Sequence, residues 1–300
     1  MINLGLCCDG IFSDYDNDGW PDLVLAGEWM PITFLHNEKG KFINKSEGSG
    51  INDRSGWWNS LAPGDFDNDG DIDYIAGNLG LNSFFKASAG KPVHIYAKDF
   101  NSDGTYDALP SLYLLDNLEK GSAWHEFPAN GRDDMIKQIL GTRAKYTNYR
   151  SYAVAPMDEI LPADKRKDAI ILSATYMASA FIRNEGNGKF SINQLPVPAQ
   201  LSQLNGIVAE DFDGDGNLDL AFNTNDYGTD PAVGRYDALN GLVLKGEGNG
   251  EFTPQSILQS GLYINGNGKA LAKLRAADGK FLLVATQNRG PLLVFKGKKT

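Results

Sequence analysis

Short apolar segments alternate with turn-forming residues along most of the chain. Residues 23–27 read Leu-Val-Leu-Ala-Gly and residues 220–222 read Leu-Ala-Phe, and each run is bounded by Gly, Asn or Asp. Runs of this length between turn signals are typical of β-strands joined by tight turns. The pattern therefore predicts an all-β fold built from consecutive antiparallel meanders.

Residues 116–162 depart from this pattern. Within them, apolar residues recur at helical spacing: Met135, Ile136, Ile139 and Leu140. Asp133 and Asp134 precede them, where acidic residues favour the first turn of a helix. A second short helix is expected near residues 149–160, before Pro162. This helical insert either packs over one end of the repeats or serves as a lid or docking element.

A nine-residue pattern occurs four times, with Asp at positions 1, 5 and 9, Asp or Asn at position 3, and Gly at position 6. The copies are the first loop (14–22, DYDNDGWPD), the second (65–73, DFDNDGDID), the third (99–107, DFNSDGTYD) and the fourth (211–219, DFDGDGNLD). A short apolar run follows each copy, so each loop connects two predicted strands.

A second element also repeats, an apolar run followed by a Gly turn and Phe, at residues 33–42, 180–190 and 242–252. Together the two elements give four strands per unit of about 40–60 residues, which is the layout of a propeller blade. Six units are expected, beginning near residues 4, 51, 92, 151, 204 and 263. The fourth and sixth lack the loop. We therefore expect one domain over residues 1–300, a β-propeller of six four-stranded blades with a small helical insert.

The loops have the ligand chemistry of calcium, which takes six to eight oxygen ligands in irregular geometry. Carboxylates at positions 1, 3 and 5 converge when the chain curls, and Gly at position 6 permits the curl. Position 7 would add a backbone carbonyl and position 9 another carboxylate. The expected ligands of about four Ca²⁺ sites are Asp14, Asp16, Asp18, Trp20 and Asp22; Asp65, Asp67, Asp69, Asp71 and Asp73; Asp99, Asn101, Asp103, Thr105 and Asp107; and Asp211, Asp213, Asp215, Asn217 and Asp219.

Other metal motifs fit less well. An EF-hand needs a bidentate Glu at position 12, where these loops have Leu25, Ala76, Pro110 and Phe222. Magnesium would keep more water, and zinc would require His or Cys. The third loop, with neutral Asn101 at position 3, is expected to bind most weakly.

These loops between strands resemble FG-GAP/VCBS repeats, the calcium-bearing blades also found in the integrin α-chain propeller. Further stretches are similar to large exported bacterial VCBS-repeat proteins, some with an ASPIC/UnbV-type region. These stretches are residues 56–60 (GWWNS), 77–82 (GNLGLN), 92–100 (PVHIYAKDF) and 131–134 (GRDD). The resemblance implies a propeller of six or seven blades outside the cytoplasm, with no established activity.

The formal charge of −10 disfavours binding to nucleic acid or to anionic membranes, but sixteen Asp residues lie in the four loops. The acidity is therefore mostly metal-ligand chemistry. Adjacent Cys7 and Cys8 predict no disulfide framework. No transmembrane segment or signal peptide is expected in this chain, which we interpret as a fragment of a longer extracytoplasmic protein (periplasmic, cell-surface or secreted).

No recognised catalytic motif occurs in the sequence. The residues best suited to contact a ligand are Trp57, Trp58, Asn59, His94 and Arg132, together with Tyr146, Tyr149 and Tyr152 of the insert. Aromatic residues stack on sugars or anchor protein interfaces. We expect a non-enzymatic adhesion or scaffold module for a protein or glycan. The alternative is a hydrolase or lyase that acts on polysaccharide, with its site near residues 116–162.

Overall fold

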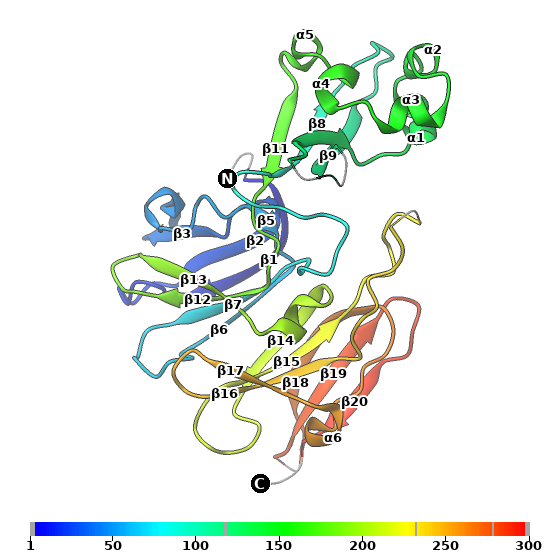
Figure 1. Cartoon of the computed structure of the whole chain (residues 1–300). Helices are drawn as coiled ribbons and strands as arrows, with labels where there is room; N and C mark the ends of the chain where they lie inside the picture. The colour runs from blue at the N-terminus through cyan, green and yellow to red at the C-terminus, as the bar shows by residue number, and fades with distance from the viewer. Residues whose placement is uncertain (1–3, 117–118, 120, 232, 278, 298–300) are drawn as a thin grey trace. The chain divides into compact units, whose positions relative to one another are not determined.

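The structure is a computed structural model that describes residues 4–116, 119, 121–231, 233–277 and 279–297. They form two compact units (Figure 1). Unit 1 comprises Met1–Phe84 with Met177–Thr300, and unit 2 comprises Phe85–Tyr176. Most of the ordered structure is β-sheet, and every strand pairing is antiparallel, as the short alternating segments predict.

Among the described residues, unit 1 contains four antiparallel sheets. The first has the order β1-β2-β3-β4, with β5 added beside β2; the second is β6-β7-β12-β13, the third β14-β15-β16-β17 and the fourth β18-β19-β20. The strands are β1 Leu6–Ser13, β2 Asp22–Met30, β3 Thr33–Glu38, β4 Lys41–Asn44, β5 Gly56–Trp57, β6 Ser60–Gly64, β7 Asp73–Gly77, β12 Ala180–Asn184, β13 Phe190–Gln194, β14 Leu204–Glu210, β15 Asp219–Thr224, β16 Leu242–Gly246, β17 Phe252–Gln255, β18 Gly268–Arg275, β19 Phe281–Gln287 and β20 Leu293–Lys296. Short helices lie between them: η1 Ser46–Gly48, η2 Val197–Gln200 and α6 Ile257–Ser260.

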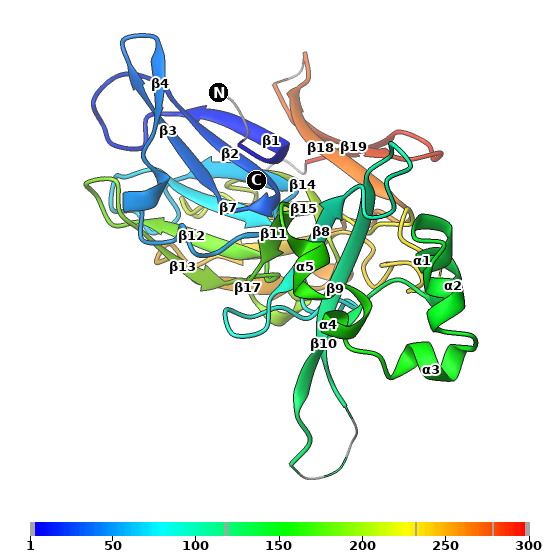
Figure 2. The same cartoon turned by 90° about the horizontal axis from the view of Figure 1, so that it is seen from above.

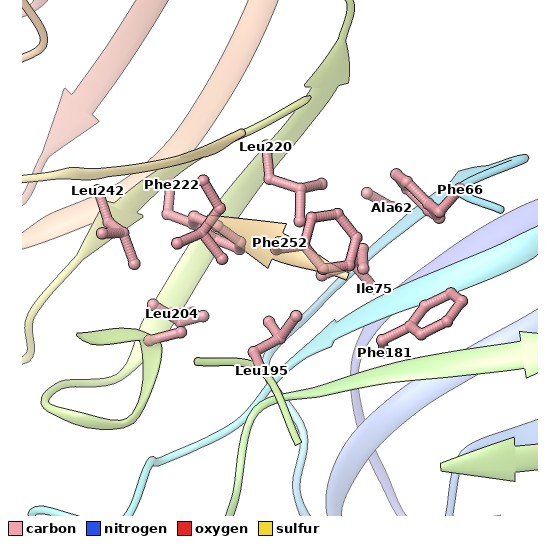
Figure 3. Close-up of a cluster of buried hydrophobic side chains, with 12 residues drawn as sticks. Ala62, Phe66, Ile75, Phe181, Leu195, Leu204, Leu220, Phe222, Leu242 and Phe252 are labelled. Carbon is pink, nitrogen blue, oxygen red and sulfur yellow. The ribbon is translucent and has the colours of Figure 1, made fainter. Parts of the chain in front are cut away.

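The sheets of unit 1 pack through their first strands. Strand β14 contacts β6 on one side and β18 on the other, and β1 contacts β6. Between the second and third sheets lies a core of buried aliphatic and aromatic side chains. Figure 3 shows Leu220, Phe222 and Phe252 from one sheet directed toward Ile75 and Phe181 of the other. Burial of this apolar surface is what stabilises the face-to-face packing.

Unit 2 is one sheet covered by short helices (Figure 2). Its strand order is β10-β9-β8-β11. The elements are β8 Val93–Lys98, β9 Asp107–Leu115, β10 Trp124–Pro128, α1 Arg132–Gln138, α2 Thr142–Lys145, α3 Tyr149–Ala153, α4 Met157–Ile160, α5 Ala163–Arg166 and β11 Ile170–Ala174. Tyr96 and Leu109 of the sheet pack against Met135, Tyr152 and Met157 from the helices.

The strand pairing differs from the six consecutive units that the sequence predicts. Strands β6 and β7 of the second sheet are completed by β12 and β13, which follow only after unit 2. The strands predicted for the fourth unit are divided between two sheets: β11 pairs with β8 in unit 2, whereas β12 pairs with β7 in unit 1. Repeat-based counting assumes that neighbouring segments pair, and residues 85–176 interrupt that order between two strands of one sheet.

The helical prediction for residues 116–162 is confirmed, because α1 to α4 fall within it. The insertion is larger than predicted, since it also contains β8 to β11 and α5. Among the described residues, no helix is both long enough and apolar enough to span a membrane.

Candidate metal centres

The carboxylate at position 1 closes each loop. One of its oxygens accepts the backbone N–H of position 5 and the other accepts that of position 6, at 2.9 to 3.2 Å. The glycine at position 6 has φ between 88° and 96°, a region that residues with a Cβ rarely adopt. The four carboxylates are Asp14, Asp65, Asp99 and Asp211. The same turn therefore forms in all four copies.

The carboxylate at position 5 makes the next bond of the turn. One oxygen of it accepts the backbone N–H of position 7, at 2.8 to 3.0 Å. The bonded pairs are Asp18 with Trp20, Asp69 with Asp71, Asp103 with Thr105 and Asp215 with Asn217. These bonds hold the side chains at positions 1 and 5 against the backbone of the turn.

The carboxylate at position 9 is buried at the start of the following strand. Asp22, Asp73, Asp107 and Asp219 are at most 4% exposed. Each accepts the N–H of position 2 of its own loop, at 3.0 to 3.4 Å. Burial raises the pKa of all four carboxyls, and that of Asp73 to about 7, because the charged form loses its solvation.

In unit 1 the position 9 carboxylate also joins the loop to the third strand of its sheet. Asp22 accepts the N–H of Asn37 at 2.7 Å, and Asp73 accepts that of Asn184 at 2.8 Å. Asp219 accepts the N–H of Gly246 at 2.9 Å. One buried side chain in each sheet thus fixes the loop, the second strand and the third strand together.

Carboxylate oxygens converge in the first, second and fourth loops. Each of these loops has three acidic residues with one oxygen apiece all within 4.8 Å of one another. The groups are Asp14, Asp16 and Asp18; Asp65, Asp67 and Asp73; and Asp211, Asp213 and Asp219. Among the described residues, the third loop forms no such group, since Asn101 replaces a carboxylate at position 3.

Asp67 tests whether these residues fit a metal ion. Its side chain is 4% exposed; Oδ1 accepts no hydrogen bond, and Oδ2 lies 2.7 Å from Nε of Arg183 in an ion pair. Oδ1 of Asp16, at the same position of the first loop, is also buried without a donor. A buried carboxylate oxygen without a partner is costly, and a hard cation bound by several oxygens would satisfy it. The all-oxygen donor set therefore fits calcium.

Hydrogen bonds at position 4 connect the loops of unit 1 to one another. The side-chain amide of Asn17 donates to Asp71 of the second loop at 2.7 Å. That of Asn68 donates to Asn217 of the fourth loop and to the carbonyl of Gly248, both at 3.1 Å. Both asparagines have φ near 60°, which their short polar side chains tolerate. The three loops thus form a connected row.

The third loop, in unit 2, contacts a helix. The side-chain amide of Asn101 donates to the carbonyl of Gln138 at 2.7 Å and to Asp103 at 2.9 Å. The side-chain oxygen of Gln138 in turn accepts the N–H of Ala108 at 2.8 Å. Helix α1 therefore contacts the third loop at position 3 and at the residue that follows the loop.

Of the candidate ligand residues Trp57, Trp58 and Asn59, only Trp58 is buried, and the other two are half-buried. Trp58 is fully buried, and its indole N–H donates to the carbonyl of Arg54 at 3.2 Å. The Trp57 ring packs edge-on against Trp29, at 5.1 Å between centroids. The amide of Asn59 donates to the Trp57 carbonyl at 2.8 Å. These contacts therefore stabilise the turn that leads into β6.

His94 and Arg132 lie in unit 2, and their recorded partners differ. His94 bonds Glu126 at 2.8 Å, and Glu126 also accepts the hydroxyls of Tyr96 and Ser111. Burial alone would raise the pKa of Glu126, but the hydrogen bonds from His94 and Ser111 take it below its usual value. Arg132 instead donates to the carbonyl of Tyr146 at 2.7 Å.

The cluster around Glu126 could not be found from sequence, because its members are brought together only by the pairing of β8, β9 and β10. Of the tyrosines singled out in the insert, Tyr146 and Tyr152 are buried in the core of unit 2. Tyr149 is exposed, and its hydroxyl donates to Asp133 at 2.6 Å.

Comparison with known proteins identifies the repeats. The family model described as FG-GAP-like repeat matches residues 14–76 and residues 163–222. The first match contains the first and second loops, and the second match contains the fourth. No curated protein matches the chain. Together with the repeated Asp-rich loops between antiparallel strands, these matches show that the chain contains FG-GAP-like repeats at residues 14–76 and 163–222.

Proposed function

We propose that the four loops bind calcium and that the ions stabilise the sheets in which the loops lie. The observation that carries this proposal is Asp67, a buried carboxylate inside a group of convergent acidic oxygens, whose Oδ1 accepts no hydrogen bond and whose Oδ2 is paired with Arg183. The residues that would hold the ion are the acidic side chains at positions 1, 3, 5 and 9 and the carbonyl at position 7. An ion bound there would offset the repulsion among these carboxylates and add its binding free energy to folding.

We further propose that the sheets are blades of a β-propeller. The antiparallel sheets of unit 1, which have three to five strands each and pack through their first strands, support this arrangement. The proposed biological role is that of a non-enzymatic binding, adhesion or scaffold module for a protein or glycan.

Extracellular calcium modules commonly have dissociation constants of about 10⁻⁴–10⁻³ M. Sites of this kind suit a calcium-rich compartment, so we place the module outside the cytoplasm.

Calcium binding is tested by thermal unfolding of the full chain in EDTA, in excess calcium and in excess magnesium. At a calcium concentration about 100 times the dissociation constant, each occupied site adds about 2.7 kcal/mol to the free energy of unfolding. We expect a clear rise in Tm with calcium and a smaller one with magnesium. A Tm that is the same in EDTA and in calcium would refute the proposal.

The matched control for this experiment replaces Asp67, Asp69, Asp213 and Asp215 by Asn. The exchange keeps side-chain size and removes carboxylates from the second and fourth loops. The variant should retain a smaller calcium-induced rise in Tm, from the first and third loops.

The binding role is tested by screening the chain against a glycan array in calcium and in EDTA. We expect retention of a glycan in calcium and its loss in EDTA, because the loops would hold the sheets that carry the surface. Binding that is unaffected by EDTA would contradict the link between calcium and recognition.

A further inference from the structure

A basic side chain reaches each Asp-rich loop of unit 1 from the third strand of the same sheet. The three residues are His36 on β3, Arg183 on β12 and Lys245 on β16. Each directly precedes the residue whose backbone N–H donates to the position 9 carboxylate. The strand registers agree, because the residue before each of them pairs with position 10 of the loop: Leu35 with Leu23, Ile182 with Tyr74, and Leu244 with Leu220.

Arg183 and Lys245 contact carboxylates expected to bind the metal. Nε of Arg183 lies 2.7 Å from Asp67, and one of its terminal nitrogens lies 3.6 Å from Asp69. Nζ of Lys245 bonds Asp213 and lies 2.8 Å from Asp215. Both basic side chains therefore contact the carboxylates at positions 3 and 5 of their loops.

The third loop differs from the second and fourth loops in two features, the place of the basic residue and the side chain at position 3. Continuing the β9–β10 register beyond Pro128 would bring Arg132 opposite Asp107. However, β10 ends at Pro128. Arg132 is the first residue of α1, and its side chain donates to the Tyr146 carbonyl instead. The same loop carries neutral Asn101 at position 3.

The charges match this difference. The second and fourth loops each have four carboxylates at positions 1, 3, 5 and 9 together with one basic side chain. The third loop has three carboxylates at these positions and, among the described residues, no basic side chain in an ion pair with them. The charge summed over these groups is therefore the same in all three loops, and the second loop carries one further carboxylate, Asp71, at position 7.

We propose that Arg183 and Lys245 are built-in counter-ions that neutralise their loops when no metal is bound and compete with calcium for the carboxylates at positions 3 and 5. This inference rests on the proposed calcium binding. A divalent ion and a basic group held by the same carboxylates repel one another at a few ångströms, so the basic group lowers the calcium affinity.

One consequence concerns the order of affinities. Counting carboxylates alone ranks the third loop weakest. Counting the counter-ions as well predicts that the third loop binds calcium about as tightly as the second and fourth.

The test is Lys245→Met, which keeps the aliphatic part of the side chain and removes the charge. Calcium titration by calorimetry should show one class of sites tightened by about tenfold, the scale of removing one unit charge at a partly solvated site. In EDTA the same variant should have a lower Tm than wild type, whereas its calcium-induced gain in Tm should be larger. A purely structural role would lower Tm by the same amount in both conditions.

Two control variants locate the effect. In a chain with both Asp213 and Asp215 replaced by Ala, adding Lys245→Met should leave the calcium titration unchanged. Lys165→Met removes the same charge from α5 and should also leave it unchanged. Should Lys245→Met fail to fold, Arg183→Met provides the same test in the second loop.

The outcomes separate this inference from the proposed function. Wild type that binds no calcium refutes calcium binding itself, and the inference with it. Wild type that binds calcium, with Lys245→Met unchanged or weaker in affinity, overturns the inference alone.

Discussion

Asp73 holds three parts of unit 1 together, so its removal gives a well-defined perturbation. The side chain is fully buried, and its two oxygens accept the N–H of Phe66 at 3.2 Å and that of Asn184 at 2.8 Å. Phe66 belongs to the second loop, and Asn184 ends β12, which is far away in the chain. In Asp73→Ala both N–H groups stay in a buried environment without an acceptor.

The expected loss follows from these two bonds. A buried donor left without an acceptor costs about 1–3 kcal/mol. Partial relaxation around the smaller side chain reduces the summed cost of the two donors. We therefore expect Asp73→Ala to lower the free energy of unfolding by about 2–4 kcal/mol at pH about 5 in EDTA.

The loss should become smaller as the pH rises. Burial raises the pKa of Asp73 from 3.8 to about 7, so between these values the folded wild type holds a proton that the unfolded chain has released. The stability of the metal-free wild type therefore falls as the pH rises through this window, whereas the variant lacks the group. The difference in the free energy of unfolding between wild type and Asp73→Ala should become smaller from pH 5 to pH 8.

The assay is urea unfolding of the full chain in EDTA, followed by tryptophan fluorescence, to which buried Trp58 of unit 1 contributes. The matched control is Asp71→Ala, which removes the same side chain from the same loop at a solvent-exposed hydrogen bond to Asn17. We expect it to cost less than about 1 kcal/mol. Equal midpoints for Asp73→Ala and Asp71→Ala at pH 5 would refute the reasoning.

Three further predictions concern other parts of the molecule. Gly70→Ala should lower stability by about 1–3 kcal/mol through backbone strain alone, because φ is 96° and a Cβ would meet nothing within 4 Å; an unchanged Tm would contradict this. Asn68→Gly keeps the positive φ and removes the bond to Asn217, so it should cost about 1 kcal/mol in unfolding experiments, and Asn68→Ala should cost more. Glu126→Gln should destabilise unit 2 by about 1–3 kcal/mol at neutral pH. The lowered pKa of Glu126 further predicts that wild-type unit 2 loses stability as the pH falls below about 4.5, which acid unfolding of the two proteins would measure and which Glu126→Gln should remove.

The local structure of the loops follows from sequence because their bonds join near neighbours. Asp65 bonds residues four and five positions ahead, and Gly70 permits the backbone conformation that this turn needs. Spacing alone is sufficient to predict such contacts, so all four loops were located without a structure. The short apolar runs likewise predict strands, since their length and boundaries are local properties.

The order of the sheets does not follow from sequence. The runs that become β7 and β12 carry no mark of their pairing, and only the burial of Ile75 with Phe181 in a shared core selects it. The candidate ligand residues illustrate the same limit. Trp58 is a suitable binding residue by type, yet it is fully buried beside Arg54.

The sequence by itself determines where four acidic turns form, because each turn is closed by its own Asp and Gly residues. It also shows a basic residue before the turn that follows the third strand, at His36, Arg183 and Lys245, but not what these side chains contact. Only the tertiary structure decides that they reach the loops. The antiparallel register places the third strand beside position 9, and residues distant in the chain then share one cluster of charge.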